Sequence, residues 1–507
     1  MARAFAYGFS HHNFYMLTGG SNFGFSAAWG VTTAYAPDTA IDFLLLRHEP
    51  KFSTVKAFNA ALTSVSAELL GNAPPAAPTR VGRFCEYAAY GADLVFVSNT
   101  GLNASATETV TVAGQQLLMP NHTVVILGKG GALIFNTSAA PDALPPRGPA
   151  APSTQSRSAP PVWSTIVEHV GFGNKTAAPA VGAPPLEMLA LTRNAVDYMY
   201  FTLRDAAVPV NASELAVSTC GGEYVYVFVG ASAESAVALP RAQLPAGADA
   251  RARNTHAFAL PHRAGPTTAA TTVYILVSAM GLSTSPSPGS CKGVRKVEAG
   301  GTDLTNAGWV SSWVFAGEAA QVFTPAGAAA ATWSPVAADG GAVPTSWFKA
   351  LFDMPPAPAP APAPSAPGSE YPAGAPPQLA YALDLAGATK GVAYVNGFNI
   401  GRYDLELGVC NGPCAPPIHG GQCYIFWRNC GLPTQRYYHV PTSLLQPTGN
   451  LVVLFEEASN VPTAGQGPVA PSPPPAALGA AQQPAGPLRG APRDLSNVAL
   501  VALTDHP

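Results

Sequence analysis

The sequence Asn13-Phe-Tyr-Met-Leu-Thr-Gly-Gly-Ser-Asn-Phe-Gly24 joins a short apolar run to a polar loop rich in glycine. The run Phe14–Leu17 predicts a β-strand, and the glycines predict a loop after it. The loop lacks the Gly-Lys-Ser/Thr ending of a P-loop and the Gly-x-Gly-x-x-Gly order of a dinucleotide site, which argues against nucleotide binding. It is either an ordinary turn or the loop after a barrel strand, where active sites form.

A helix pattern follows this loop. The apolar residues that recur at helical spacing are Phe52, Val55, Phe58 and Leu62. Pro50 suits the first turn of a helix. Residues 13–68 therefore predict a strand, a long loop and a helix.

After residue 68 the pattern is that of β-strands. Short runs rich in strand-forming residues recur between turn signals, at 93–98, 123–128, 132–136, 224–229 and 450–456. Lys129-Gly-Gly131 predicts a hairpin turn, and Asn396-Gly397 is a strong two-residue hairpin signal. This spacing predicts sandwiches or jelly rolls.

Composition limits the classes of function. The chain has 507 residues, of which 11% are charged, and its net charge is -3, so it has no basic field for nucleic acid. The apolar runs are far shorter than the roughly 20 residues of a membrane helix. Residues 1–10 show no signal peptide. Ala/Pro-rich stretches at 139–160, 355–377 and 461–492 predict linkers or disordered tails.

The cysteines indicate an oxidising compartment. Four of the seven are clustered, at Cys410, Cys414, Cys423 and Cys430. This density in a loop-rich segment predicts disulfides. A zinc site is the alternative, although the spacings do not repeat the two-residue knuckle. Glycosylation sequons are consistent with secretion, although chance alone would supply several; they stand at Asn103, Asn121, Asn136, Asn174 and Asn211.

The stretch from Asn13 resembles the last barrel strand of glycoside hydrolase family 35, the β-galactosidases, which typically reads N-x-Y-M-x-x-G-G-T-N-F-G. Further segments are similar to motifs of the plant-type enzymes and keep their order. These segments are Val31–Tyr35, Ala40–Asp42, Leu46–Lys51, Leu191–Tyr200, Val395–Tyr403, Gln435–Pro441 and Pro447–Glu457. Together they are highly specific, and they span about residues 13–457.

The resemblance implies a mainly β chain, with tandem β-sandwich or jelly-roll domains after the last strand and helix of a truncated (β/α)8 barrel. The start of the chain would lie near the end of that barrel. The expected divisions are 1–70 as the barrel remnant, 80–140 as a small antiparallel β domain, 139–160 as a linker, 161–335 as a galactose-binding-like jelly roll, 345–458 as a second one with a Pro-rich insert at 355–377 and a Cys-rich loop, and 461–507 as a disordered tail.

The reaction that the resemblance implies is retaining hydrolysis of terminal β-galactosides. It needs two carboxylic acids roughly 5 Å apart. In the family both are glutamates on barrel strands that precede the match to Asn13, so this chain is expected to lack them. Within residues 1–70 the only glutamates are Glu49, which suits a helix start, and Glu68. Asp38 and Asp42 are loop acids, and no catalytic residue is predicted.

The resemblance also implies sugar contacts. Tyr15 matches a tyrosine beside the sugar subsite, and its hydroxyl could bond a sugar or the nucleophile; a core tyrosine is the alternative. Asn22 and Trp29 in the adjoining loop are further candidates. Thr18 and the segment 35–40 depart from the family pattern and leave the shape of the pocket open.

No metal and no cofactor are expected. The adjacent histidines His11 and His12 would point to opposite faces of a strand, and hydrolysis in the family needs no metal. The aromatic residues at 424–427 and 436–438 could stack on a sugar ring, although such residues more often fill a jelly-roll core.

Three functions remain as hypotheses: part of a β-galactosidase, a non-catalytic module that binds galactose-containing oligo- or polysaccharides, or a Pro/Ala-rich wall protein. The resemblance implies an extracellular, cell-wall or vacuolar location. The sequence leaves the oligomeric state unknown.

Overall fold

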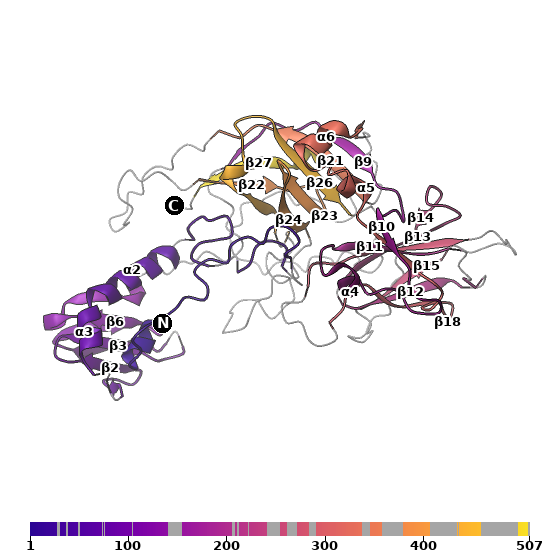
Figure 1. Ribbon diagram of the computed structural model, residues 1–507. Helices are drawn as coiled ribbons and strands as arrows, with labels where there is room; N and C mark the ends of the chain where they lie inside the picture. Colours follow the sequence, from indigo (N-terminus) through magenta and orange to yellow (C-terminus); the bar gives the residue numbers. More distant parts are fainter. Residues whose placement is uncertain are drawn as a thin grey trace, which may run out of the picture.

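The structure is a computed structural model, and it confirms a mainly β chain built from antiparallel sheets (Figure 1). It describes residues 1–27, 31–36, 39–48, 51–73, 75, 77–103, 105–139, 155–204, 208–209, 212–221, 223–240, 254–260, 271–282, 290–336, 345–356, 379–405, 433, 435–457 and 495–504. Within these residues, every helix is too short or too polar to span a bilayer.

The first part of the chain forms a small unit of helices and strands (Figure 1). Helices α1 (Ala2–Ala6), α2 (Lys51–Ser64) and α3 (Ser66–Gly71) pack on one face of a five-stranded sheet, and the β4–β5 hairpin covers the other. The strands are β1 (Thr79–Arg80), β2 (Cys85–Tyr90), β3 (Leu94–Asn99), β4 (Glu108–Val112), β5 (Gln115–Met119), β6 (Val124–Leu127) and β7 (Leu133–Asn136), with 3-10 turns η1 (Lys129–Gly131) and η2 (Thr137–Ala139). Phe58 and Leu62 of α2 are buried in this unit, as the helical spacing predicts.

The predicted strand at residues 13–18 is wrong. In the part of the chain that the structure describes, this segment makes one isolated bridge, a parallel one between Thr18 and Ile41. A strand is stable only when a neighbour accepts and donates its backbone hydrogen bonds. With a single bridge available, the segment is a loop.

The first β-sandwich is built from residues 175–313. Its larger sheet has the order β10-β19-β11-β16-β13-β14, and its smaller sheet has the order β15-β12-β17-β18. The strands are β10 (Lys175–Ala177), β11 (Tyr198–Leu203), β12 (Glu214–Thr219), β13 (Tyr224–Gly230), β14 (Val237–Ala238), β15 (Thr255–Ala259), β16 (Thr272–Ser278), β17 (Val294–Ala299), β18 (Thr302–Asp303) and β19 (Val310–Trp313). Helix α4 (Met188–Thr192) precedes β11. The two sheets enclose a core with Phe201, Ile275 and Phe258.

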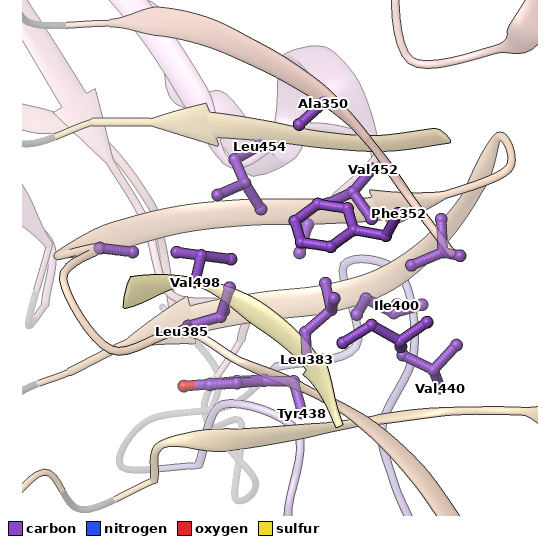
Figure 2. Packing of buried hydrophobic residues seen from close by; sticks show 14 of the residues in the cluster. Ala350, Phe352, Leu383, Leu385, Ile400, Tyr438, Val440, Val452, Leu454 and Val498 are labelled. Atoms are coloured by element: carbon purple, nitrogen blue, oxygen red, sulfur yellow. The ribbon is translucent and has the colours of Figure 1, made fainter. Parts of the chain in front are cut away.

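The second β-sandwich draws its strands from both sides of the first. Its larger sheet has the order β20-β9-β21-β26-β23-β24, and its smaller sheet has the order β25-β22-β27-β8. The elements are β8 (Gln155–Arg157), β9 (Ser164–Val167), α5 (Ala316–Ala319), α6 (Pro325–Ala330), β20 (Ser334–Pro335), β21 (Ser346–Phe352), β22 (Leu379–Asp384), β23 (Lys390–Val395), β24 (Phe398–Asp404), β25 (Tyr437–Val440), η5 (Thr442–Leu444), β26 (Asn450–Glu456), η6 (Leu495–Asn497) and β27 (Ala499–Thr504). Figure 2 shows Phe352, Val452 and Leu454 of the larger sheet packed with Leu383 and Tyr438 of the smaller sheet.

Three strands depart from the expected divisions. Strand β8 lies in the expected linker 139–160, and β9 lies in the expected first jelly roll although it pairs with β21 in the second sandwich. Strand β27 lies in the expected disordered tail 461–507, yet it pairs with β22 and β8. Disorder therefore does not hold for Ala499–Thr504, because the apolar side chains of this strand are buried on both faces of its sheet.

The larger sheets of the two sandwiches pack against each other, which gives four β layers. In β11, Met199 and Phe201 face the core of the first sandwich while Tyr198 and Tyr200 face the second sandwich. Strand β26 alternates in the same way between the core of its own sandwich and this interface. Because both faces of these strands are buried, they read as continuous apolar runs instead of alternating ones.

Candidate functional site

Two of the candidate sugar-contacting residues, Tyr15 and Asn22, lie on a loop in the described part of the chain. Tyr15 is 82% exposed in this structure. Its hydroxyl accepts a hydrogen bond from Tyr35, and this bond, with the charge of Tyr15 and burial, raises the pKa of the Tyr35 hydroxyl. Asn22 is half-buried, and its backbone N–H donates to the carbonyl oxygen of Thr33 at 2.8 Å. Trp29 lies outside the described residues.

Two stretches of this loop lie against each other, and we call them together the docked loop: residues 19–27 and 31–36. Ser21 and Ala34 form an antiparallel bridge. Gly19 approaches Tyr35 so closely that a Cβ atom on Gly19 would lie 1.5 Å from the carbonyl oxygen of Tyr35. Only glycine fits at this position, so the Gly-Gly pair of the motif has a local structural cause.

The docked loop packs on the second sandwich. Phe23 meets the ring of Phe398 edge-on at 5.4 Å between centroids, and the N–H of Gly24 donates to the carbonyl oxygen of Asn399 at 3.1 Å. Gly401 in β24 has φ 118°, and a Cβ there would lie 2.4 Å from the Thr33 methyl carbon. A larger residue at 401 would separate the loop from the strand.

Gln435, in the second sandwich, connects this sandwich to the docked loop through its side-chain amide. Its Oε1 accepts hydrogen bonds from the Thr32 hydroxyl at 2.8 Å and the Ala34 N–H at 3.1 Å. Its Nε2 donates to the Thr33 hydroxyl at 2.7 Å and to the Tyr437 carbonyl oxygen at 3.0 Å. The side chain is 4% exposed, so all these bonds form away from water. The segment Val31–Tyr35 and the segment Gln435–Pro441, far apart in the sequence, therefore meet.

The loop continues onto the smaller sheet of the second sandwich. The Asp42 carboxylate accepts from the N–H groups of Leu44 and Leu46, both at 2.9 Å, and fixes a tight turn. Phe43, Leu44 and Leu46 then pack against Ala382 and Val501. Asp42 thus has a structural role in this turn.

Three other motif segments meet in a buried group of charges between the sandwiches. We call Asp197, Lys292, Lys390, Arg402 and Glu457 the charged cluster; each is at most 4% exposed. Glu457 Oε1 lies 2.6 Å from Arg402 Nη2, and Glu457 Oε2 lies 3.2 Å from Lys390 Nζ. Asp197 Oδ1 lies 3.1 Å from Lys292 Nζ.

Polar neighbours complete the charged cluster. Tyr198 donates to Glu457 at 2.6 Å, Ser278 donates to it at 2.7 Å, and Arg402 donates to the Tyr198 hydroxyl. Burial opposes ionisation of Glu457, but the charges of Arg402 and Lys390 outweigh it and hold the pKa of Glu457 below its ordinary value. Since this carboxylate is fully enclosed and fully paired, it serves the interface and not a substrate.

A second group of carboxyls in the same interface is held mainly by N–H donors. We call Glu168 and Glu318 the carboxyl pair. Glu168 accepts from the N–H groups of Ala316 at 3.0 Å and Gly317 at 2.7 Å, and from the Trp347 indole at 2.6 Å. Glu318 accepts from the Phe315 N–H at 2.8 Å. Burial raises the pKa of both carboxyls, that of Glu318 to about 7.

A groove of about 710 Å³ opens on the second sandwich between β9, β21 and α6. Its walls include Val162, Pro325 and Leu351, and its polar groups include Lys349 and Gln446. Lys349 is already engaged, because its Nζ donates to Ala328 and lies 4.6 Å from the centre of the Trp333 ring. Among the described residues, no group of three or more His, Cys, Asp or Glu side chains is arranged to hold a metal ion.

The disulfide in the described residues joins Cys220 and Cys291, which the sequence reasoning missed. Cys220 follows β12 and Cys291 precedes β17, and these strands pair, but a separation of 71 residues hides this in the sequence. The four clustered cysteines, Cys410, Cys414, Cys423 and Cys430, lie outside the described residues. Cys85 is a buried free thiol, and burial raises its pKa to about 12.

The sequons differ in accessibility. Asn103 and Asn174 are exposed, whereas Asn121 and Asn136 are half-buried. The Asn136 side chain also accepts hydrogen bonds from Ser138 of its own sequon. Asn211 lies outside the described residues.

Comparison with known proteins finds similarity to plant β-galactosidases. Residues 345–450 match the family described as "Beta-galactosidase, galactose-binding domain". The chain is 26% identical over 499 residues to β-galactosidase 8 of Arabidopsis thaliana, covering 91% of this chain and 52% of that protein. It is 26% identical over 484 residues to β-galactosidase 12 of Oryza sativa subsp. japonica, covering 91% and 46%. It is 25% identical over 478 residues to Arabidopsis β-galactosidase 13, covering 91% and 49%.

The chain thus spans about half the length of the curated relatives that it matches. The matches cover nearly all of this chain, and the motif segments in the described residues contact one another in the fold. The match at residues 345–450 and the similarity to plant β-galactosidases agree with the resemblance of this chain to glycoside hydrolase family 35.

Proposed function

We propose that this chain supplies the β-sandwiches and a sugar-contacting loop to a β-galactosidase that hydrolyses terminal non-reducing β-D-galactosyl residues. The observation that carries the proposal is the buried docking of Thr32, Thr33 and Ala34 on Gln435. This docking connects the docked loop, which follows the segment that resembles a barrel strand, to the sandwich that matches the galactose-binding family. A loop held in this way can present Tyr15 and Asn22 to a sugar.

The chemistry of the complete enzyme would be retaining hydrolysis by two glutamates. One carboxylate attacks the anomeric carbon while the other carboxylic acid protonates the leaving oxygen, and the second group then activates water. We assign neither role to a residue of this chain. The Tyr15 hydroxyl, exposed and able to donate its proton, would bond a sugar hydroxyl, and Asn22 and Trp29 would complete the contact.

Isolation of the native protein tests this proposal. An antibody against residues 345–450 would capture it, and its intact mass and its turnover of a chromogenic β-galactoside would be measured. We expect a hydrolytic species heavier than 51.9 kDa by roughly a barrel of about 250 residues. The recombinant 507-residue chain should show no turnover. An inactive native species of the same mass as this chain would contradict the proposal.

The second candidate function is a non-catalytic galactoside-binding protein. The groove between β9, β21 and α6 favours it, because several of its walls lie within the residues matched by the galactose-binding family. Retention of the recombinant chain on a galactan affinity gel, without turnover, would support this function. Substitution Lys349→Met should then reduce retention, whereas Lys296→Met, on the other sandwich, should not.

We also propose an extracellular, cell-wall or vacuolar location. The Cys220–Cys291 disulfide supports it, because disulfides persist in oxidising compartments. Mass spectrometry of the native protein would test this location through a glycan on Asn103 or Asn174.

A further inference from the structure

We propose that Gln435 of the second sandwich is a positioning residue for sugar recognition, acting through the docked loop. The inference rests on the proposed function and extends it to a residue outside the barrel-like segment. Gln435 lies in the sequence about 400 positions from the residues that it holds. Its role is therefore visible only in the fold.

The first step is the geometry of the four hydrogen bonds. The amide oxygen of Gln435 accepts two bonds from the docked loop, while the amide nitrogen donates one bond to the loop and one to Tyr437, the first residue of β25. Each donor and acceptor of the buried side chain is thus assigned. A buried amide with all its bonds made fixes its partners in one register, because any shift leaves polar groups unpaired.

The second step leads from Gln435 to the candidate sugar contacts. Thr33, held by the amide nitrogen, accepts the backbone N–H of Asn22 at 2.8 Å. Ala34, held by the amide oxygen, precedes Tyr35, whose hydroxyl donates to Tyr15. Both Asn22 and the exposed Tyr15 therefore depend on residues that Gln435 clamps.

The third step concerns the other contacts that hold the docked loop near Gln435. The Phe23–Phe398 contact and the Gly24–Asn399 hydrogen bond place the same loop on β24. These contacts keep the loop near the sandwich when Gln435 is changed, so that the expected result is loss of register and not unfolding.

The test uses Gln435→Met, which keeps the size of the side chain and removes all its hydrogen bonds, with Gln116→Met at an exposed position of β5 as the control. Hydrogen exchange of the full chain should become at least about tenfold faster at the N–H groups of Asn22 and Ala34, as loss of roughly 1.4 kcal/mol implies. Exchange in β21 should stay unchanged. Gln435→Glu keeps the acceptor for Thr32 and Ala34 and should rescue part of the protection. Unchanged exchange in Gln435→Met would overturn the proposal.

The second experiment measures steady-state kinetics of the enzyme expressed from its complete gene. Gln435→Met should raise KM for a chromogenic β-galactoside by about tenfold with kcat nearly unchanged, because sugar contacts are lost in the ground state and the transition state alike. A merely structural role would lower the active fraction, and hence kcat, at constant KM. An unchanged KM in an active enzyme would overturn the positioning role alone. Absence of turnover in the unsubstituted enzyme would overturn the proposed function and this role with it.

Discussion

The charged cluster and the carboxyl pair bury acidic side chains in the same interface by opposite means. In the charged cluster, Glu457 is surrounded by Arg402 and Lys390, and its pKa is held low. In the carboxyl pair, Glu168 and Glu318 are held mainly by N–H donors, and burial raises their pKa values, which the charge of His169 offsets only in part at Glu168. A row of rings, Tyr198, Phe455 and Trp347, connects the two places.

The difference shows that burial alone does not set the charge of an interface. A cation within contact distance keeps a buried carboxylate ionised, whereas hydrogen bonds from neutral N–H groups only partly offset the loss of water. The two places should therefore respond in opposite directions to pH. They also share one interface, so that a single unfolding measurement reports on both.

The largest expected effect is the loss of Arg402. Arg402→Met removes the guanidinium that pairs with Glu457 and leaves that carboxylate buried with less compensation. Breaking a buried pair by removing one partner costs roughly 3–5 kcal/mol of unfolding free energy. Urea denaturation of the full chain at pH 7 would measure it. A cost below about 1 kcal/mol would mean that the cluster is not tightly coupled and would break the comparison.

The next effect is the pH dependence of the carboxyl pair. The pKa of Glu318 rises from its ordinary 4.5 to about 7 in the folded chain. The folded state therefore binds more protons, and this contribution to stability is full below pH 4.5 and is lost as the pH rises to 7. The loss amounts to roughly 3 kcal/mol. Denaturation curves between pH 4.5 and 8 should show it in the wild type and lack it in Glu318→Gln.

Glu457 serves as a comparison in the same experiment, because its contribution to stability changes with pH in the opposite direction. Its folded pKa is lowered, so its contribution is present above the ordinary value and is lost as the pH falls through the folded value. Glu457→Gln should therefore leave the loss between pH 4.5 and 7 in place. A variant that abolished that loss would show that the titrating group is not in the carboxyl pair.

A smaller effect is expected when one hydrogen-bond donor is removed from the charged cluster or from the carboxyl pair. Tyr198→Phe removes a hydrogen bond to Glu457, and Trp347→Phe removes one to Glu168. Each should cost roughly 1.5–3 kcal/mol, the range for bonds to charged groups. The cost of Trp347→Phe should grow as the pH rises, because burial disfavours the ionised form of Glu168 and the neighbouring N–H donors and the charge of His169 offset this only in part. The cost of Tyr198→Phe should stay constant between pH 5 and 8, and equal pH profiles for the two variants would contradict the distinction.

The smallest effect is expected at an exposed ion pair, which serves as a reference for the buried ones. Lys296 and Glu298 form an exposed pair at 2.7 Å on the first sandwich. Lys296→Met should leave the unfolding free energy nearly unchanged, since solvent screens exposed pairs. Added salt should reduce that small effect further, while the cost of Arg402→Met should hardly change.

The sequence allowed prediction of the local elements but not of their partners. The helical spacing of Phe58 and Leu62 was sufficient for α2, because a helix satisfies its own hydrogen bonds. The Asn396-Gly397 turn between β23 and β24 was equally local. The strand at 13–18 could not be judged in this way, because a strand depends on a neighbour that the local pattern does not reveal.

The same reason limits prediction of the site. The motifs around Asp197, Arg402 and Glu457 could be recognised, but their spacing gave no sign that they form one buried cluster. The same holds for Gln435, whose partners lie about 400 residues away. The Cys220–Cys291 bond escaped for a related reason, since two cysteines 71 residues apart give no local signal.

The sequence by itself determined a mainly β chain that resembles β-galactosidases, the helix at 51–64 and the turn chemistry of its hairpins. These follow from residue spacing, composition and motif order, which are properties of neighbouring residues. Only the tertiary structure decided that β27 closes the second sandwich, that the larger sheets pack face to face, and which buried carboxyls keep their charge. Those outcomes depend on contacts between distant segments, because burial and the position of a counter-ion exist only once the chain is folded.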